Sequence, residues 1–249
     1  MKTFCNPVVL PNYPKLAILS KKPLGDIWNR AGKNIVDEFI LMKEAGLPME
    51  EIDPAILAES GSKEFTQCTE NDVRATADPT VVQFQDRFYL YATSGMVYDS
   101  DDLCTWTPHY DETWAPLAAA MAPTVEEFCG KYYAAANRTP LHVSDSPLGP
   151  WKQLGDFRLP DGREVIFWDP MIFADADRLF IYFGLGISIM GAELDPDNPV
   201  QMITTPRVLI QFNPHHSWER HGAHNEDWRK GYIEGSYMNK LNGKYYLTY

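Results

Sequence analysis

Residues 78–93 read DPTVVQFQDRFYLYAT, and the same order of parts occurs three more times along the 249-residue chain. Each copy starts with an acidic or small residue followed by Pro or Gly, continues with a few apolar residues, crosses a polar turn and ends in an aromatic-rich run. The other copies are APTVEEFCGKYYAAAN (122–137), DPMIFADADRLFIYFG (169–184) and EGSYMNKLNGKYYLTY (234–249). Runs of β-branched and aromatic residues on both sides of a turn predict a β-hairpin in each copy.

The spacing of the copies indicates how the hairpins are assembled. They start at positions 78, 122, 169 and 234, so the spacings are 44, 47 and 65 residues. A period of about 40–50 residues with four short strands per unit is typical of β-propeller blades. Residues 96–110 and 140–155 supply further strand-like pieces after the first two hairpins. A β-sandwich is the alternative, but the repeated order of parts favours a propeller, with three blades and the first hairpin of a fourth.

Residues 1–70 differ from the rest and predict a lead-in with a short helical insertion, ahead of a propeller domain at 71–249. Within residues 26–53, apolar positions recur at roughly helical spacing. Gly46 and Pro48 then mark the end of the helix. A second short helix is expected near Pro54, and the whole insertion is expected to cover an edge or a rim of the propeller.

Composition and charge limit the classes of binding partner and the cellular location expected for this protein. The net charge of -12, from 34 acidic and 22 basic residues, argues against nucleic acid, because polyphosphate binding needs a positive surface. No apolar run approaches the roughly 20 residues that cross a bilayer, which argues against a membrane protein. The proline-interrupted N-terminus lacks the apolar stretch of a secretory signal. A cytoplasmic location is therefore expected, with a secreted or periplasmic one as the alternative if the N-terminus was trimmed.

The cysteines bear on disulfides and zinc, and the aromatic residues bear on sugar binding. The cysteines are scattered without a CxxC pair, so buried free thiols are expected rather than disulfides or a zinc site. Aromatic residues make up 13% of the chain, which suits both strands and sugar-binding surfaces where flat rings stack on sugar faces.

Carboxylates stand at the start of three of the four copies: Asp78, Asp169 and Glu234, whereas the second copy starts with Ala122. The innermost strand of each propeller blade lines the central axis, so residues that start these strands converge at one end of the channel. Converging carboxylates repel one another, and at least one is expected to have a raised pKa. A single Asp-Pro often only opens a turn. Three acids in register favour a shared site, in which a protonated acid beside an ionised one could hydrolyse glycosides.

The stretches ADPTVV (77–82), MAPTV (121–125), WDPMIF (168–173) and YIEGSYMNKLNGKYYLTY (232–249) resemble the blade motifs of glycoside hydrolase family 43. Its members are five-bladed β-propeller enzymes. The resemblance implies a five-bladed fold, of which this chain would hold about three and a half blades. It also implies that Asp78 is the general base, that Asp169 modulates the pKa of the acid, and that Glu234 is the general acid.

The resemblance further implies an inverting glycosidase acting on arabinofuranosyl or xylosyl linkages of plant oligosaccharides or polysaccharides. Inversion goes with carboxyl groups about 6.5–9.5 Å apart, which leaves room for a water molecule. Trp168 is expected to stack on sugar or, as the alternative, to pack between blades. Met121, which stands where Trp is usual, and His224, in the His-rich loop at 213–228, are the other candidate substrate contacts. No metal ligand is assigned and no cofactor is required; a structural calcium ion occurs in the family but is not assigned here.

Two other classes of function stay open. One is a non-catalytic carbohydrate-binding propeller or an inactive fragment of such an enzyme. The other is a related five-bladed enzyme that cleaves fructans or phosphorolyses mannosides. The third copy reads Trp168-Asp169-Pro170 instead of Arg-Asp-Pro, which counts against the fructan group. No basic phosphate pocket is evident for a phosphorylase, and the sequence leaves the oligomeric state open.

Overall fold

The computed structural model describes residues 78–92, 97–109, 121–184 and 186–249, and these residues are almost entirely strands and turns. The predicted all-β class is confirmed. Within the described residues, the one helical element is the short 3₁₀ helix η4 (Ser217–Glu219). The predicted lead-in at 1–70, with its helical insertion, lies outside the described residues. No helix in the described part of the chain is long and apolar enough to cross a bilayer.

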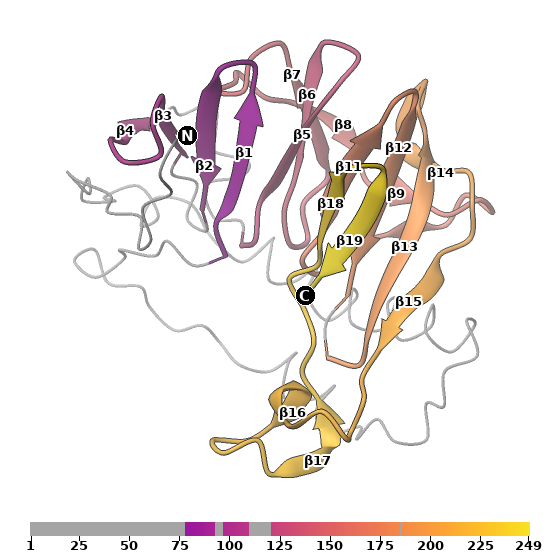
Figure 1. Cartoon of the computed structure of the whole chain (residues 1–249). Coiled ribbons are helices and arrows are strands. Elements are labelled where there is room, and N and C mark those ends of the chain that lie inside the picture. The colour runs from indigo at the N-terminus through magenta and orange to yellow at the C-terminus, as the bar shows by residue number, and fades with distance from the viewer. Residues whose placement is uncertain (1–77, 93–96, 110–120, 185) are drawn as a thin grey trace, which may run out of the picture.

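The strands form successive sheets, and in the first two of these the strands are antiparallel and follow one another in chain order (Figure 1). The first sheet contains β1 (Thr80–Phe84), β2 (Arg87–Tyr91), β3 (Val97–Ser100) and β4 (Thr107–His109). The second contains β5 (Thr124–Phe128), β6 (Lys131–Ala135), β7 (Leu141–Ser144) and β8 (Lys152–Gly155). Each is a four-stranded unit, as the repeat predicted.

The third sheet is larger, and two hairpins follow it. Its central strands are β11 (Met171–Asp175), β12 (Arg178–Phe183), β13 (Ser188–Asp195) and β14 (Asn198–Met202). It is extended by β15 (Arg207–Gln211) beside β13 and by β9 (Phe157–Arg158) and β10 (Glu164–Val165) beyond β14. The hairpins are β16 (Arg220–His221) with β17 (Asp227–Gly231), and β18 (Tyr237–Leu241) with β19 (Lys244–Thr248). Three sheets and the first hairpin of another agree with the predicted count in the described residues; the total of five blades stays a prediction.

All four predicted repeat hairpins are present, and each turns over two residues. The first turn residue has a positive φ in every case: Gln85 at 55°, Cys129 at 51°, Ala176 at 57° and Asn242 at 52°. Two-residue hairpin turns need positive φ because only then does the turn match the twist of its strands. The polar and small residues at these turns therefore set the register of each strand pair.

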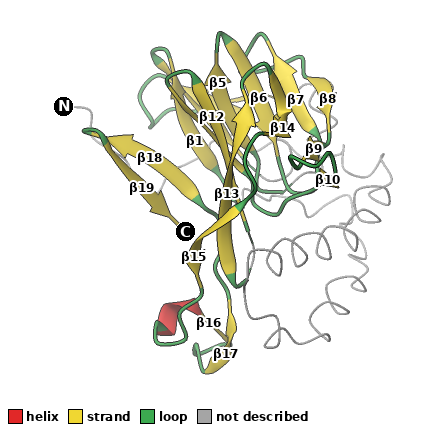
Figure 2. Cartoon of the chain, turned by 90° about the vertical axis from the view of Figure 1, so that its right-hand side faces the viewer, coloured by secondary structure: helices red, strands yellow, loops and turns green. Residues whose placement is uncertain are grey.

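Strands β1, β5, β11 and β18 are the innermost strands of their sheets, and they start at the same end of the molecule (Figures 1 and 2). Contacts join β1 to β5, β5 to β11, and β11 to β18. The four repeats thus lie around a shared axis, which is the arrangement that brings the starts of their first strands together.

Apolar side chains from adjacent sheets hold this arrangement. Phe84, Tyr132 and Trp151 belong to a buried cluster between the first and second sheets. Phe167 and Phe183 stack at 4.0 Å in the larger cluster between the second and third. Full burial of one such side chain stabilises the fold by roughly 1.5–3 kcal/mol. The relative position of the sheets, and so of the strand starts, follows from these contacts.

The two described cysteines correct one expectation. Cys104 and Cys129 form no disulfide, as predicted, but both are exposed, so the expectation of buried thiols is wrong for them. Cys129 is exposed because it occupies the β5–β6 turn, where the hairpin leaves the core. Cys5 and Cys68 lie outside the described residues.

Candidate active site

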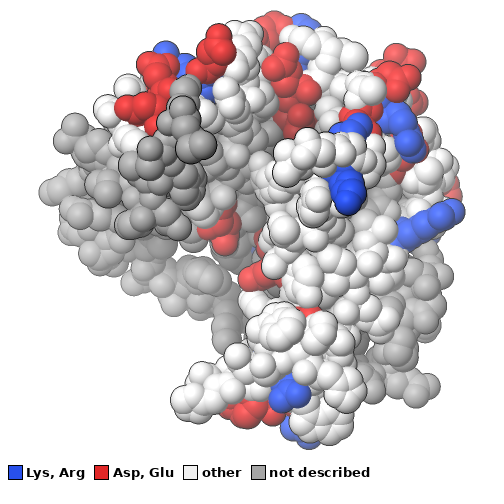
Figure 3. Space-filling model, viewed as in Figure 1, with Lys and Arg blue, Asp and Glu red and all other residues white. Residues whose placement is uncertain are grey.

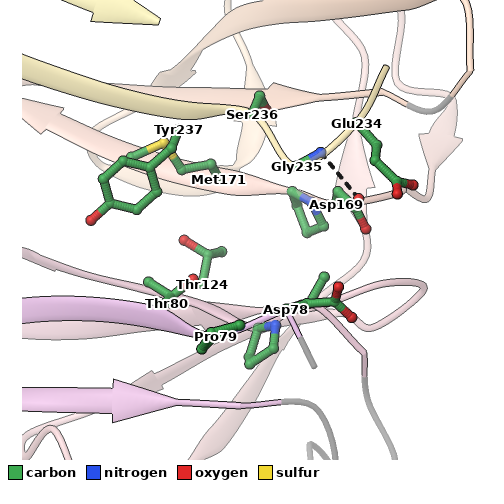
Figure 4. Close-up of a pocket in the computed structure, with 13 residues that line it drawn as sticks. Asp78, Pro79, Thr80, Thr124, Asp169, Met171, Glu234, Gly235, Ser236 and Tyr237 are labelled. Carbon is green, nitrogen blue, oxygen red and sulfur yellow. Dashed lines mark hydrogen bonds between the residues drawn. The ribbon is translucent and has the colours of Figure 1, made fainter. Parts of the chain in front are cut away.

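A cavity of about 230 Å³ lies where the four innermost strands begin (Figure 4). It is lined by four short segments, one from each repeat: Asp78–Thr80, Ala122–Thr124, Asp169–Met171 and Glu234–Tyr237. In the space-filling view, acidic side chains are visible in the hollow near the middle of the molecule, whereas basic ones lie on the outer surface (Figure 3). The site is therefore built from residues far apart in the sequence that the sheet packing brings together.

All three acids that the sequence singled out line this one cavity. Asp78, Asp169 and Glu234 come from three different repeats. Their carboxylates lie toward the same side of the cavity in Figure 4. Asp78 is exposed, whereas Asp169 and Glu234 are half-buried. The predicted convergence of the acids at the start of the innermost strands is thus seen in the structure.

Glu234 does not occupy the same repeat position as the two aspartates, so the expectation of three acids in register is wrong. In the first three repeats the first paired residue of the inner strand lies two positions after the residue that starts the repeat: Thr80, Thr124 and Met171. In the fourth repeat the first paired residue, Tyr237, lies three positions after Glu234. The equivalent of Asp78 and Asp169 in the fourth repeat is therefore Gly235. Glu234 comes one residue earlier, at the position of Met121 and Trp168. Counting back seven residues from the first turn residue, Asn242, would have revealed this offset.

A left-handed backbone marks the start of each inner strand. The φ angles are 50° at Asp78, 52° at Ala122, 46° at Asp169 and 65° at Gly235. Glycine adopts this conformation readily and aspartate more easily than most residues, whereas it is uncommon for alanine. Such strain is concentrated at functional sites, where the surrounding structure maintains it. The chain therefore bends sharply at the point where each repeat contributes to the cavity.

Asn137, at the end of the second repeat, holds Asp169 in place and was missed by the sequence reasoning. Its buried side-chain oxygen accepts a hydrogen bond from the backbone N–H of Asp169. Its own N–H donates to the carbonyl of Met121 at 2.8 Å. The Asp169 carboxylate in turn accepts a hydrogen bond from the Gly235 N–H at 3.2 Å. The second, third and fourth repeats are thus linked at the cavity.

Glu234 is held through its neighbour, Ile233, which is buried and forms an isolated β-bridge with Gly186, in the connection between β12 and β13. Ile233 N–H donates to the Gly186 carbonyl at 3.0 Å, and Gly186 N–H donates back at 2.9 Å. Gly184, two residues earlier, has a φ of 148°, and a Cβ there would come within 2.1 Å of the Ser188 carbonyl oxygen. The glycine at this position therefore allows the two backbone segments to pack tightly.

Burial and neighbouring charges in the cavity raise the pKa values of Glu234 and Asp169. Burial raises the pKa of Glu234 to about 7, and the charges of Asp169 and Asp78 add to this effect. Burial also raises the pKa of Asp169, and Asp78 adds to that, while hydrogen bonds from Asn137 and Gly235 oppose it. These shifts agree with the expectation that at least one converging carboxyl group would hold its proton more tightly.

None of the three predicted substrate contacts lines the cavity, although Met121 and Trp168 are next in sequence to residues that do. Trp168 is half-buried beside Asp169, and its ring lies 4.0 Å from the guanidinium carbon of Arg138. Met121 precedes Ala122 and accepts the Asn137 hydrogen bond. His224 is exposed on the loop between β16 and β17, where its N–H donates to Glu226 at 2.8 Å. Contact of these three side chains with substrate stays a prediction.

The predicted His-rich loop uses two of its imidazoles for packing. His216 stacks on Trp218 at 4.5 Å, and His221 lies 5.9 Å from Tyr232. Among the described residues, no group of three or more His, Cys, Asp or Glu side chains is placed to hold a metal ion.

Glu126, two residues beyond Thr124 on β5, is a further acid whose pKa is raised. Burial raises its pKa to about 8. Between about pH 4.5 and 8 the native state therefore retains a proton that the unfolded chain has lost, and this group makes stability fall as pH rises. We expect Glu126→Gln to raise the Tm by about 2–4 °C at high pH. A Tm measurement across pH would contradict this if the difference from wild type did not grow with pH.

Comparison with known proteins places this geometry in a family. The model of "Glycosyl hydrolases family 43" matches residues 72–249. The β-D-galactofuranosidase xynD of Aspergillus niger is 28% identical over 209 residues, which are 70% of this chain and 55% of that protein. The chain thus spans about half the length of this curated relative.

Solved structures share the fold. A thermostable family-43 glycoside hydrolase matches with a TM-score of 0.50 and 26% identity, over 68% of this chain and 62% of that one. GH43B of the Bacteroides ovatus xyloglucan PUL matches with a TM-score of 0.52 and 16% identity, over 70% of this chain and 35% of that one. The arrangement of sheets is consistent with the β-propeller of these neighbours. Because the family model matches well over half of its length, the chain belongs to glycosyl hydrolases family 43.

Proposed function

We propose that this family-43 glycoside hydrolase cleaves arabinofuranosyl or xylosyl linkages of plant saccharides by single displacement with inversion. The observation that carries the proposal is the meeting of three carboxyl groups from three repeats in one cavity, with a pKa of about 7 for Glu234. A protonated carboxyl group and a carboxylate on one cavity are the two groups that glycoside hydrolysis requires.

Glu234 is the general acid in this mechanism. Its proton goes to the glycosidic oxygen as the bond from that oxygen to the anomeric carbon breaks. Asp78, the exposed acid of the three, is the general base and takes a proton from the water whose oxygen bonds to the anomeric carbon. Water is thus divided between the two products, and the acid and base return to their starting states by exchange with solvent.

Asp169 modulates the acid. Its charge raises the pKa of Glu234, and its carboxylate accepts a hydrogen bond from Gly235, the residue next to the acid. Because a general acid must be protonated, kcat/KM is expected to fall as pH rises through about 7. Asp169 therefore extends the active range toward higher pH.

Removing the charge of Asp169 tests this role. Asp169→Asn is expected to lower the pKa of Glu234 and to move the alkaline limb of the kcat/KM profile to lower pH by about one unit. Asp177→Asn is the matched control, because it makes the same charge change at an exposed turn at the far end of the same hairpin. An alkaline limb that stays in place in Asp169→Asn would contradict the modulating role.

A β-D-galactofuranosyl linkage is the second candidate substrate, favoured by the similarity to the Aspergillus niger β-D-galactofuranosidase. Incubating the full-length protein with aryl α-L-arabinofuranosides, β-D-xylosides and β-D-galactofuranosides distinguishes the candidates by release of the phenol. NMR of the first anomer formed tests inversion. Binding of saccharides without any sugar release would contradict the hydrolase and favour a non-catalytic carbohydrate-binding propeller.

A further inference from the structure

The hairpin that precedes Glu234 presents an unusual group of exposed rings. We call residues 216–232, which include η4, β16 and β17, the aromatic hairpin. Its exposed fractions are 68% for Trp218, 61% for Trp228 and 52% for Tyr232. Trp218 and Trp228 are the two exposed tryptophans among the described residues. Of the others, Trp106 and Trp151 are buried and Trp168 is half-buried. Scattered exposed apolar residues are normal on protein surfaces, but a local group of large aromatic rings usually marks a binding site.

Internal contacts hold some of these rings in position before any ligand binds. The His216 ring stacks on Trp218 with an angle of 17° between the planes. His216 is in turn anchored by Glu219, which is only 2% exposed and accepts hydrogen bonds of 2.6 Å from His216 Nδ1 and from the Asn213 N–H. Tyr249 O–H also donates to Glu219, at 2.7 Å. A ring held in this way loses little conformational freedom on binding.

The aromatic hairpin leads along the chain directly into Glu234, which lines the cavity. Ile233 is buried and forms the bridge with Gly186, so the extended chain places Tyr232 and Glu234 together on the opposite face. Tyr232 is tied back to the hairpin by a 2.8 Å hydrogen bond from its N–H to the Glu219 carbonyl. The hairpin projects beyond the end of the propeller at which the inner strands start (Figures 1 and 2). A chain leaving the cavity on this side would meet Tyr232 first.

The charge of the aromatic hairpin indicates what kind of saccharide chain it can bind. The aromatic hairpin, residues 216–232, contains three acidic and three basic residues with its histidines neutral, so it carries no net charge in a protein of net charge -12. The carboxylates of the cavity repel anions. Flat exposed rings with no excess charge suit the apolar faces of neutral sugars, which stack on tryptophan and tyrosine.

We propose that the aromatic hairpin binds the leaving-group side of a neutral oligosaccharide, with Tyr232 next to the cleaved bond and Trp218 and Trp228 stacking on sugars farther along. The inference rests on the proposed function and extends it, because it makes the enzyme select chains over short glycosides. The hairpin is then the element that makes the affinity for the substrate depend on its chain length.

Binding measurements on the inert Glu234→Gln form of the full-length protein test the inference. Titration calorimetry with linear arabino- and xylo-oligosaccharides is expected to show affinity that rises with chain length. Adding Trp218→Ala or Trp228→Ala should weaken the affinity for the longer chains by about 2–10-fold for each ring. Trp→Phe at the same positions should restore part of it, because a ring remains. Leu154→Ala, at an exposed apolar residue on β8, should leave the affinity unchanged.

Two results would overturn the proposal. One is affinity for the longer chains that is equal with and without the tryptophans. The other is failure of acrylamide to quench these tryptophans in the full-length protein, which would show that another segment or subunit covers them. Failure of the hydrolase proposal would look different, because wild-type protein would release no sugar while the tryptophan-dependent affinity persisted.

Discussion

Glu234→Gln is expected to lower kcat by about 10²–10⁴-fold on glycosides with poor leaving groups, such as alkyl glycosides and oligosaccharides. Glutamine keeps the size and polarity of the side chain but cannot donate an acid proton to the glycosidic oxygen. The measurement is kcat with substrates of the same sugar and increasingly basic leaving groups. Glycosides of acidic phenols need little protonation, so their loss should be much smaller.

The control for this variant is a carboxyl-to-amide change outside the cavity. Glu164→Gln is suitable because Glu164 lies on β10, with its side chain exposed and paired with Arg158. It should keep wild-type rates with every leaving group. Near-normal turnover of poor-leaving-group substrates by Glu234→Gln would remove Glu234 from the acid role, even if the protein proved to be a glycosidase.

Asp78→Asn is expected to lower kcat by a comparable factor, about 10²–10⁴-fold, but to the same extent with good and poor leaving groups. The reason is that the base activates water, and this step is needed whichever alcohol departs. Asparagine tolerates the left-handed backbone at this position, where φ is 50°. The loss should therefore reflect chemistry rather than a distorted strand start, which a circular dichroism melt can verify.

Chemical rescue separates the base role from general damage to the site. Asp78→Ala leaves space beside the anomeric carbon, and Ala122 shows that alanine is accommodated in the same backbone conformation in the second repeat. Added azide, which needs no deprotonation, should restore turnover and give a glycosyl azide of inverted configuration. Azide rescue of Glu234→Gln with this stereochemistry, and none of Asp78→Ala, would exchange the two assignments.

Much of the fold could be predicted because its information is local. The hairpins depend on aromatic and β-branched runs on both sides of a two-residue turn, and such patterns are legible in one sequence. The repeat of these hairpins then predicted that Asp78 and Asp169 would meet, and both line the cavity. The exposure of Cys129 was missed because the general preference of cysteine for the interior outweighed its place in a turn.

Other features depend on residues that are distant in the chain. Asn137 reads as the end of a strand, and only the packing of the second sheet on the third reveals its hydrogen bond to Asp169. The role of the tryptophans on the aromatic hairpin likewise depends on where that hairpin projects, and no periodicity in the sequence encodes its direction.

Local sequence patterns specify an all-β chain of repeated hairpins with acids at or beside the starts of three inner strands, because strand pattern and turn chemistry act between near neighbours. The tertiary structure alone decided that the pKa of Glu234 is raised to about 7. Burial and the charges of Asp169 and Asp78 produce that shift. Both exist only after three separate sheets have packed against one another.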